Sequence, residues 1–280
     1  MENRLEENAL GDGGASVAAE NSTTRKRPRG RTVGAWGVLG VLLTAVAVAA
    51  LCSAIQGARE AWRRTGCAVN LKNIEVAIFA YNAANGVLPP AYTVDEAGRP
   101  LHSWRVLILP YLESSPLYRE IRLDEPWDSE WNSQFHSQAP SIFACPIGRS
   151  AAPEGTATGK TTYSVVVGDE TAFPSAGKWR KWEDFADGLS KTLAVVERKT
   201  PVCWMDPTQE LTLETLATEL ANEHKAGKRG EGGALAATFD AAVRFIPAST
   251  DAATLKGAAT VAGGEKVGEF ERVETTFAAN

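Results

Sequence analysis

The sequence predicts an α+β protein in which one long N-terminal helix precedes a domain of short helices, strands and long loops. Two observations support this class. The first third of the chain carries a charge-free apolar stretch that continues, without a proline, into a segment of helical periodicity. The remainder carries short runs of β-branched residues between glycine and proline turns, and it lacks the regular alternation of strands and helices that a parallel sheet requires.

The apolar stretch runs from Val33 to Ile55 and contains no charged residue. As a helix, its 23 residues would cross a hydrocarbon layer of about 30 Å, so we expect a transmembrane helix at 33–55. A cleaved signal peptide is the alternative. We favour an uncleaved anchor, because the stretch is longer than the usual apolar core of a signal peptide and 32 residues precede it.

Basic residues gather before the apolar stretch. They are Arg25, Lys26, Arg27, Arg29 and Arg31. Three arginines follow it, at 59, 63 and 64, so the excess of positive charge lies on the N-terminal side. Because this excess favours the cytoplasm, we expect a single-pass protein of the cytoplasmic membrane with its N-terminus inside and its C-terminal domain outside. Residues 1–32 are polar and are expected to form a disordered cytoplasmic tail.

The helix is expected to continue beyond the membrane as an amphipathic segment. Leu71, Ile74, Ile78 and Tyr81 recur at spacings of three and four, which places them on one stripe of a helix. Asn85-Gly86 is a typical helix stop, and the prolines at 89 and 90 prevent continuation. The stripe should therefore pack against the domain that follows.

We expect one extracytoplasmic domain at 56–262 and a flexible tail at 263–280. Four runs in the domain are predicted to be strands, of which the last two form a hairpin, and they cover 161–167, 192–197, 234–239 and 243–246. A short helix is predicted at 251–256. The tail is polar after Gly263-Gly264, as fraying chain ends commonly are.

Seven segments of the chain resemble one bacterial family. They are AREAWRRTGCAVNLKNIEVAIFAYN (58–82), HSWRVLILPYLE (102–113), LDEPWDSEWN (123–132), FACP (143–146), TTYSVVVGDETAFP (161–174), ADGLSKTLAVVE (186–197) and FDAAVRFI (239–246). The family is the domain of unknown function 1559, also filed as a solute-binding-type domain and similar to type II secretion pseudopilins. The resemblance implies a pilin-like fold, in which a membrane helix runs into an amphipathic helix packed on an antiparallel sheet.

The chain departs from the family pattern at two places. Members usually begin the apolar run with a glycine followed by Phe-Thr-Leu-Ile-Glu, whereas Arg31 stands at the place of the glycine and Trp36 at that of the glutamate. Near the C-terminus, the usual Asp-Gly-Ser-Val is replaced by a run from Asp240 to Val243 that has no glycine, so a glycine-dependent turn is altered. Because the glycine and the glutamate of the prepilin signal are missing, an uncleaved chain would be an anchored subunit or adaptor rather than a polymerising pilin.

The resemblance also implies structural roles for particular residues. Cys67 and Cys145 occupy positions that the family commonly fills with cysteine. A disulfide between them would close a loop and stabilise the fold by roughly 4 kcal/mol in the chain-entropy model. Two buried thiols are the alternative. Cys203 would stay unpaired and Cys52 would lie in lipid.

Two further motifs are expected to be structural. Trp104-Arg105 begins a segment that the resemblance places on a helix ending at Pro110. Pro126-Trp127-Asp128 combines turn chemistry with a large apolar anchor.

No catalytic or metal-binding motif is readable. His102, His136 and His224 have no second histidine at metal spacing, and we place His224 in a polar helix end or loop. Carboxylates cluster at 124–130 and 183–187. We favour turn-forming aspartates at these positions, and calcium binding is the alternative. We expect no cofactor, and the net charge of −5 gives no reason to expect nucleic-acid binding.

The leading functional hypothesis is a pseudopilin-like envelope protein of structural or protein-interaction type, without catalysis. Its partners would be the membrane and envelope proteins or further copies of itself, bound through the N-terminal helix, where small residues let backbones approach. The second hypothesis is a membrane-tethered module that binds a solute or glycan. An envelope hydrolase is the third, and it requires a histidine within hydrogen-bond reach of a nucleophile.

Overall fold

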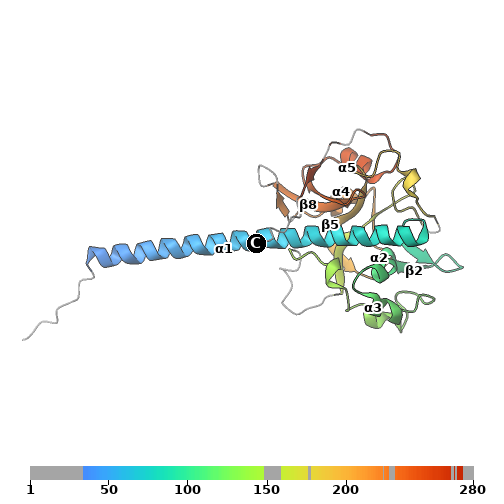
Figure 1. Ribbon diagram of the computed structural model, residues 1–280, viewed down its shortest axis with the longest axis horizontal. Helices are drawn as coiled ribbons and strands as arrows, with labels where there is room; N and C mark the ends of the chain where they lie inside the picture. Colours follow the sequence, from blue (N-terminus) through green and yellow to red (C-terminus); the bar gives the residue numbers. More distant parts are fainter. Residues whose placement is uncertain are drawn as a thin grey trace, which may run out of the picture. The chain divides into compact units, whose positions relative to one another are not determined.

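The computed structural model describes residues 34–147, 159–175, 178–222, 224–226, 231–265, 268 and 270–273. The expected tail at 1–32 and its basic residues Arg25, Lys26, Arg27, Arg29 and Arg31 lie outside the described residues. The chain divides into two compact units, one ending at Leu51 and the other beginning at Cys52. Helix α1 contributes to both units, and every other described helix and strand lies in the second (Figure 1).

Helix α1 runs from Ala35 to Asn85 and is the long N-terminal helix that the sequence predicts. In the second unit, Leu71, Ile74 and Ile78 of the predicted stripe are fully buried, and Tyr81 is partly buried. The helix ends at the predicted stop. Gly86 adopts a positive φ of 73°, and its N–H donates a hydrogen bond of 2.7 Å to the carbonyl of Asn82.

A six-stranded antiparallel sheet forms the centre of the second unit. The strand order is β10-β9-β8-β5-β3, and β7 also pairs with β8. The strands are β3 Lys160–Ser164, β5 Leu193–Cys203, β7 His224–Ala226, β8 Glu231–Thr238, β9 Ala242–Pro247 and β10 Glu271–Arg272. The sheet, the helix and the short helices confirm the predicted α+β class.

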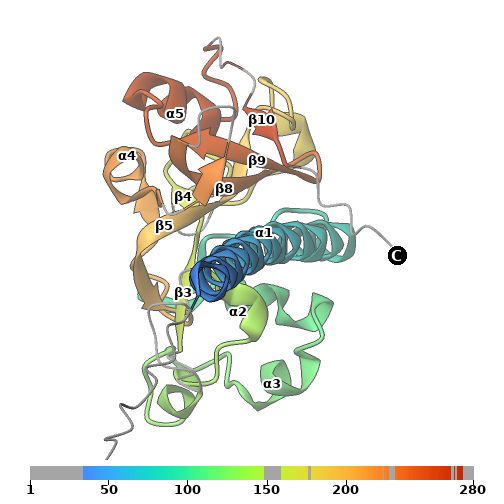
Figure 2. The ribbon, with the colours of Figure 1, turned by 90° about the vertical axis from the view of Figure 1, so that its left-hand side faces the viewer.

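Both faces of the sheet are buried. Because successive side chains of a strand point to opposite faces, Val195 of β5 shares a core with Leu71 of α1, whereas Val196 points to a second core. That second core includes Leu216 of α4 (Leu216–Glu219) and Leu255 of α5 (Ala252–Ala259). The second half of α1 therefore covers one face, and α4 and α5 cover the other (Figure 2).

Smaller elements complete the domain. Strands β1 and β2 form an antiparallel pair, and β4 and β6 form a short parallel pair. These elements and the remaining helices are β1 Tyr92–Val94, β2 Pro100–Ser103, β4 Val166–Val167, β6 Leu211–Thr212, α2 Trp104–Ile108, α3 Ser115–Glu120, and the 3₁₀ helices η1 Leu109–Tyr111, η2 Asn132–Phe135, η3 Ser141–Phe143 and η5 Trp182–Asp184.

The predicted single strand at 161–167 is wrong, because the chain leaves the sheet between β3 and β4. Val165 donates its N–H to Oε2 of Glu210 at 3.0 Å, and its carbonyl accepts the N–H of Leu211 at 3.2 Å. These bonds redirect the chain toward β6. A run of β-branched residues cannot reveal this break, because the partner carboxylate lies 45 residues further along the sequence.

The segment after Trp104 also differs from expectation. Helix α2 ends at Ile108, and Pro110 continues the chain as part of the 3₁₀ helix η1 rather than stopping it. Proline is tolerated at this position because the first residues of a helix have no intrahelical partner for their N–H groups.

The C-terminal elements agree in part with expectation. The hairpin of β8 and β9 is confirmed, and so is α5, which Asp251 caps by accepting the N–H of Thr254 at 2.9 Å. Part of the segment 263–280, expected to be a flexible tail, instead forms β10. Val273 fixes it by donating its N–H to the carbonyl of Val243 at 2.8 Å.

Candidate functional site

The apolar part of α1 exposes its side chains. Within the described residues, α1 is the one helix that is long and apolar enough to cross a membrane. Its exposed large apolar side chains include Trp36, Val38, Leu39, Val41, Leu42, Leu43, Val46, Val48, Leu51 and Ile55. Soluble proteins rarely leave so large a continuous apolar surface in water, so this segment fits a membrane anchor. Gly34 and Gly40 face open space, which leaves room for a neighbouring helix to approach closely.

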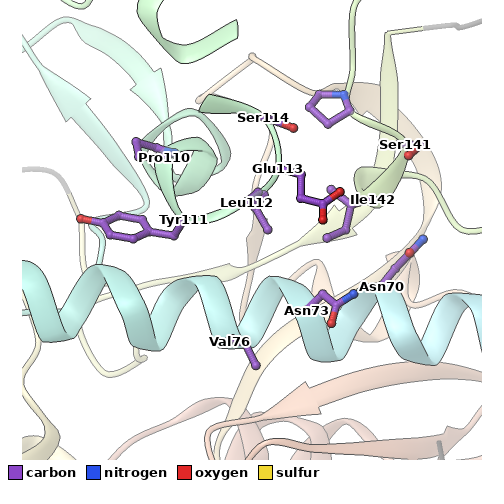
Figure 3. A pocket seen from close by; sticks show the side chains of 11 residues that line it. Asn70, Asn73, Val76, Pro110, Tyr111, Leu112, Glu113, Ser114, Ser141 and Ile142 are labelled. Carbon is purple, nitrogen blue, oxygen red and sulfur yellow. The ribbon is translucent and has the colours of Figure 1, made fainter. Parts of the chain in front are cut away.

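A groove lies beside α1 in the second unit (Figure 3). It encloses about 760 Å³, which is within the usual range for a ligand site. Asn70 and Asn73 line it from α1, and the loop after η1 contributes Glu113 and Ser114 on the opposite side, with Ser141 of η3 beside them. The lining is therefore rich in amide, hydroxyl and carboxylate groups, which suit hydrogen bonds to a polar ligand.

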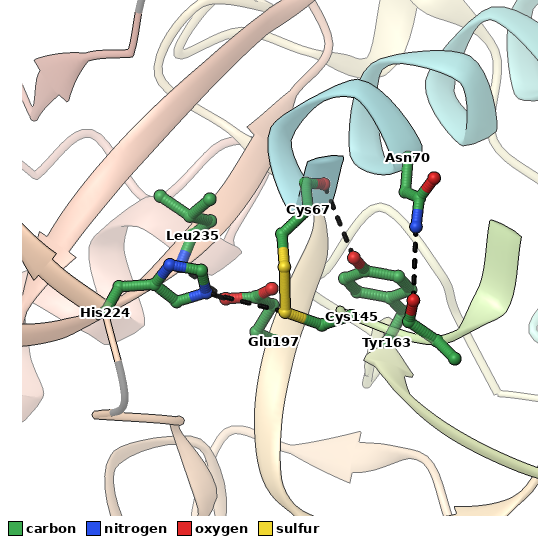
Figure 4. Close-up of a disulfide and its surroundings, with 8 residues drawn as sticks. Cys67, Asn70, Cys145, Tyr163, Glu197, His224 and Leu235 are labelled. Atoms are coloured by element: carbon green, nitrogen blue, oxygen red, sulfur yellow. Dashed lines mark hydrogen bonds and ion pairs between the residues drawn. A yellow bond between two sulfur atoms is a disulfide. The ribbon is translucent and has the colours of Figure 1, made fainter. Parts of the chain in front are cut away.

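A disulfide joins Cys67 of α1 to Cys145, which follows η3 (Figure 4). It is the pairing that the family resemblance implies. The two Cα atoms are 4.8 Å apart, and both side chains are buried. The bond fixes the loop that carries η3 to the start of the buried half of α1. Cys52 and Cys203 are free, as expected, with Cys52 exposed.

A histidine–glutamate pair lies against this disulfide. His224 of β7 places its Nε2 2.6 Å from Oε2 of Glu197 in β5 and 3.7 Å from Sγ of Cys145. Oε2 of Glu197 also accepts the N–H of Leu235 at 2.9 Å. Both side chains are almost completely buried. The expectation that His224 lies in a polar helix end or loop is wrong, because β7 pairs with β8 and carries the imidazole into the core.

Tyr163 closes the other side of the same cluster. Its hydroxyl donates to the carbonyl of Cys67 at 3.4 Å (Figure 4). Burial raises the pKa of this phenol well above its ordinary value, and the nearby Glu197 carboxylate raises it further. Tyr163 therefore remains a neutral hydrogen-bond donor.

Arg105 is the centre of a second buried polar network. Its side chain is inaccessible to solvent and pairs with Glu210, with Nη1 2.6 Å from Oε1. Nε and Nη2 both donate to the carbonyl of Tyr163. Trp104 stacks beneath the guanidinium, whose carbon lies 4.8 Å from the ring centroid. The geometry places the Trp104-Arg105 motif in the core, where it joins α2 to β3.

The Pro126-Trp127-Asp128 motif forms a turn near α3. The N–H of Trp127 donates to the carbonyl of Leu101 at 2.9 Å, and its ring stacks on His136 with centroids 5.0 Å apart. Asn132, which is fully buried, donates to the carbonyl of Pro126 at 2.9 Å. The motif therefore holds a loop together, and its indole packs on the main core.

Two of the carboxylates considered for calcium, Asp184 and Asp187, bind the backbone. Asp187 accepts the N–H groups of Gly263 and Gly264 at 2.7 and 3.0 Å. Asp184 accepts the N–H of Lys181 at 2.9 Å. These are the bonds of turn-forming aspartates.

The remaining histidines do not form a metal site among the described residues. His102 of β2 is buried, and its burial lowers the pKa of the imidazole. His136 places its Nε2 2.9 Å from the carbonyl of Trp127. One group of possible metal ligands does occur, and it consists of Cys67, Cys145, Glu197 and His224.

An α+β domain that follows one apolar helix fits the class of membrane-anchored proteins. Residues 56–218, more than half of the chain, match the protein family described as "Protein of unknown function (DUF1559)", SBP_bac_10. The chain belongs to this family. No curated protein and no solved structure matches the chain significantly. The matched range contains Cys67, Cys145 and Glu197 and ends before His224.

Sequence reasoning missed Glu197, Glu210 and the role of His224. One signal was available for Glu197, because it stands two residues after Val195 in a predicted strand and must share the core-facing side. Glu210 gave no such signal, since its partner Arg105 is 105 residues away.

Proposed function

We propose that the protein is a pseudopilin-like, single-pass protein of the cell envelope that acts by protein contact and has no catalytic activity. Its N-terminus would lie in the cytoplasm and its domain on the outer side of the cytoplasmic membrane. The observation that carries the proposal is α1, one 51-residue helix that exposes apolar side chains in its first part and supplies core residues in its second.

The described chemistry supports the outer location of the domain. The disulfide between Cys67 and Cys145 is a bond that persists in oxidising compartments and is rare in the cytosol. The excess of basic residues before Val33 favours the same orientation. Protease added to intact spheroplasts is expected to degrade the domain.

The apolar part of α1 supports protein contact within the membrane. Helices in lipid associate through small residues that allow close backbone approach, and Gly34, Gly37, Gly40, Ala45 and Ala49 provide them. The expected partner is a second copy of this chain or the apolar helix of another envelope protein.

Cross-linking at Cys52 tests this proposal. Cys52 is a natural probe because it is exposed, free and located near the end of the apolar stretch. In membranes, a short bismaleimide is expected to join two chains or a chain and a partner. Cys203→Ser should leave the product unchanged, and Cys52→Ser should abolish it. Gly40→Leu should reduce its yield several-fold, whereas Val41→Leu, one position further, should have little effect.

Two results would contradict the proposal. One is that the protein stays monomeric both with the Cys52 reagent and with a lysine-reactive cross-linker, and that pull-down recovers no partner. The other is an equal effect of Gly40→Leu and Val41→Leu, because contact through small residues requires a difference between them.

The groove favours a second candidate, a membrane-tethered module that binds a solute or glycan. Its volume of about 760 Å³ and the side chains of Asn73 and Glu113 suit a polar ligand. Thermal shift of the detergent-solubilised chain with N-acetylglucosamine and its short oligomers tests this candidate. Saturable stabilisation that Asn73→Leu removes would support it, and an unchanged melting temperature throughout the series would count against it.

A further inference from the structure

The disulfide and the adjacent histidine–glutamate pair bring four metal-ligand side chains into one buried cluster. Cys67 comes from α1, Cys145 follows η3, Glu197 comes from β5 and His224 from β7 (Figure 4). One ligand atom of each lies within 4.8 Å of the others. Three elements and one loop, all distant in sequence, therefore bring these side chains together in the core.

The spacing of these atoms approaches that of a tetrahedral zinc site. Zn²⁺ binds thiolate sulfur at about 2.3 Å and imidazole nitrogen at about 2.0 Å, so neighbouring ligand atoms of a tetrahedral site lie roughly 3.3–3.8 Å apart. Sγ of Cys145 is already 3.7 Å from Nε2 of His224. Two changes are required. The bonded sulfur atoms must separate, and Glu197 must present its other oxygen or move away, because Oε2 lies 2.6 Å from Nε2 of His224, too close for two ligands of one zinc ion.

An unsatisfied carboxylate oxygen provides a second observation. Oε1 of Glu197 is buried and has no hydrogen-bond partner among the described residues. Buried polar atoms are rarely left unpaired, because the loss of their hydration is costly. Glu197 could offer either of its oxygens to an ion, whereas the present arrangement uses only Oε2.

We propose that reduction of the disulfide converts this cluster into a Zn²⁺ site formed by Cys67, Cys145, Glu197 and His224. The disulfide and the metal would then be two exclusive ways of closing the same part of the core. This inference concerns the domain alone and is independent of how α1 is anchored.

The conversion balances with a dithiol as reductant. The dithiol passes two electrons and two protons to the cystine, so that the Cys67–Cys145 bond breaks, two thiols form and the reductant becomes a disulfide. Zn²⁺ then displaces the two thiol protons to water. It binds the two sulfur atoms, a carboxylate oxygen of Glu197 and Nε2 of His224, and the proton that Nε2 donates to Glu197 in the oxidised chain moves to Nδ1.

Titration of the full chain with Co²⁺ tests the proposal. The protein is solubilised in detergent in a Cys52→Ser/Cys203→Ser background, which removes the other thiols, and is reduced anaerobically with a phosphine. We expect one Co²⁺ per chain, with thiolate charge-transfer bands and tetrahedral d–d bands that Zn²⁺ abolishes. The oxidised chain should show none of these bands. His224→Ala and Glu197→Ala should each weaken binding at least about ten-fold, since both remove a ligand.

His136→Ala is the matched control and should bind Co²⁺ like the parent. Far-UV circular dichroism establishes whether the reduced chain stays folded. Three results would overturn the proposal: a reduced chain that binds no Co²⁺, an oxidised chain that binds it equally well, or binding that is indifferent to both His224→Ala and Glu197→Ala. The last result would also identify a reduced chain that has unfolded and binds the metal through sulfur alone.

Discussion

Glu75 is a carboxyl group that the fold buries on the side of α1 facing the β8–β9 hairpin. Its Oε1 accepts the N–H of Ala241 at 2.8 Å, and Oε2 has no partner among the described residues. Burial raises the pKa of Glu75 to about 8, against the lowering effect of this hydrogen bond and of Lys72 and Arg244. Near neutral pH the native state therefore holds this proton, whereas the unfolded chain does not.

The raised pKa of Glu75 predicts that the native state loses stability as the pH rises. Because the native pKa of Glu75 lies above the unfolded value of about 4.3, the native state binds more protons between these values, and the free energy of unfolding falls from about pH 4.5 to pH 8. Glu75→Gln keeps an oxygen for the N–H of Ala241 and removes the titration. Urea unfolding in detergent is expected to show the variant more stable above pH 8, by an amount on the order of a few kcal/mol.

The comparison of parent and variant isolates this group from the other titrations. His102 acts in the opposite sense, because its pKa is lowered by burial and its contribution to stability is lost as the pH falls below about 6.5. It does so equally in both proteins. Parallel stability curves from pH 5 to pH 9 would show that Glu75 does not hold a proton in the native state.

The buried pair of Arg105 and Glu210 makes a second prediction at the scale of the residue. Both side chains are almost inaccessible to solvent, so removal of one partner leaves an uncompensated buried charge. Glu210→Ala is expected to cost about 3–5 kcal/mol in the free energy of unfolding. Arg99→Ala is the control, because Arg99 pairs with Asp95 but is exposed, and it should cost less than about 1 kcal/mol. Equal losses would contradict the assignment of Arg105 and Glu210 to the core.

At the scale of the element, the β8–β9 hairpin carries a strained residue. Ala241 has a φ of 59°, a conformation in which glycine is free of the penalty that a Cβ atom brings. The family pattern described above usually has glycine in this turn. The strain is tolerated because Ala241 donates its N–H to Glu75 and the hairpin fixes both neighbouring strands.

Replacement of this alanine by glycine should stabilise the protein. We expect Ala241→Gly to raise the free energy of unfolding by up to about 1 kcal/mol, because it relieves the left-handed conformation. The same change at Ala253, which is exposed in α5, should lower it by about 1 kcal/mol, because glycine is a poor helix former. Urea unfolding of both variants measures the difference in sign. A loss of stability in Ala241→Gly would show that the conformation of Ala241 is not strained.

Across the whole molecule, the sequence predicts those elements that depend on residues close together in the chain. The spacing of Leu71, Ile74 and Ile78 predicted the buried face of α1, and the stop at Asn85-Gly86 predicted its end. The two apolar runs around Asp240 predicted the β8–β9 hairpin, since their turn lies between them in sequence. These features depend on residues within a few positions of one another.

Features that depend on distant partners could not be predicted in the same way. The exit of the chain at Val165 depends on Glu210, and the burial of His224 depends on the pairing of β7 with β8 beside Cys145. The disulfide came from the family resemblance, because cysteine spacing alone does not determine pairing. The candidate cluster at the disulfide therefore requires the fold, which brings α1, β5, β7 and the loop after η3 together.

In the proposed protein, residues 33–55 remain in the mature chain as its membrane anchor. N-terminal sequencing of the protein extracted from the membrane fraction determines whether they do. We predict a sequence that begins before Val33, on a protein that resists extraction by alkaline carbonate. A mature chain that begins after Ile55, or a chain recovered in the soluble envelope fraction, would show that these residues are not a permanent anchor.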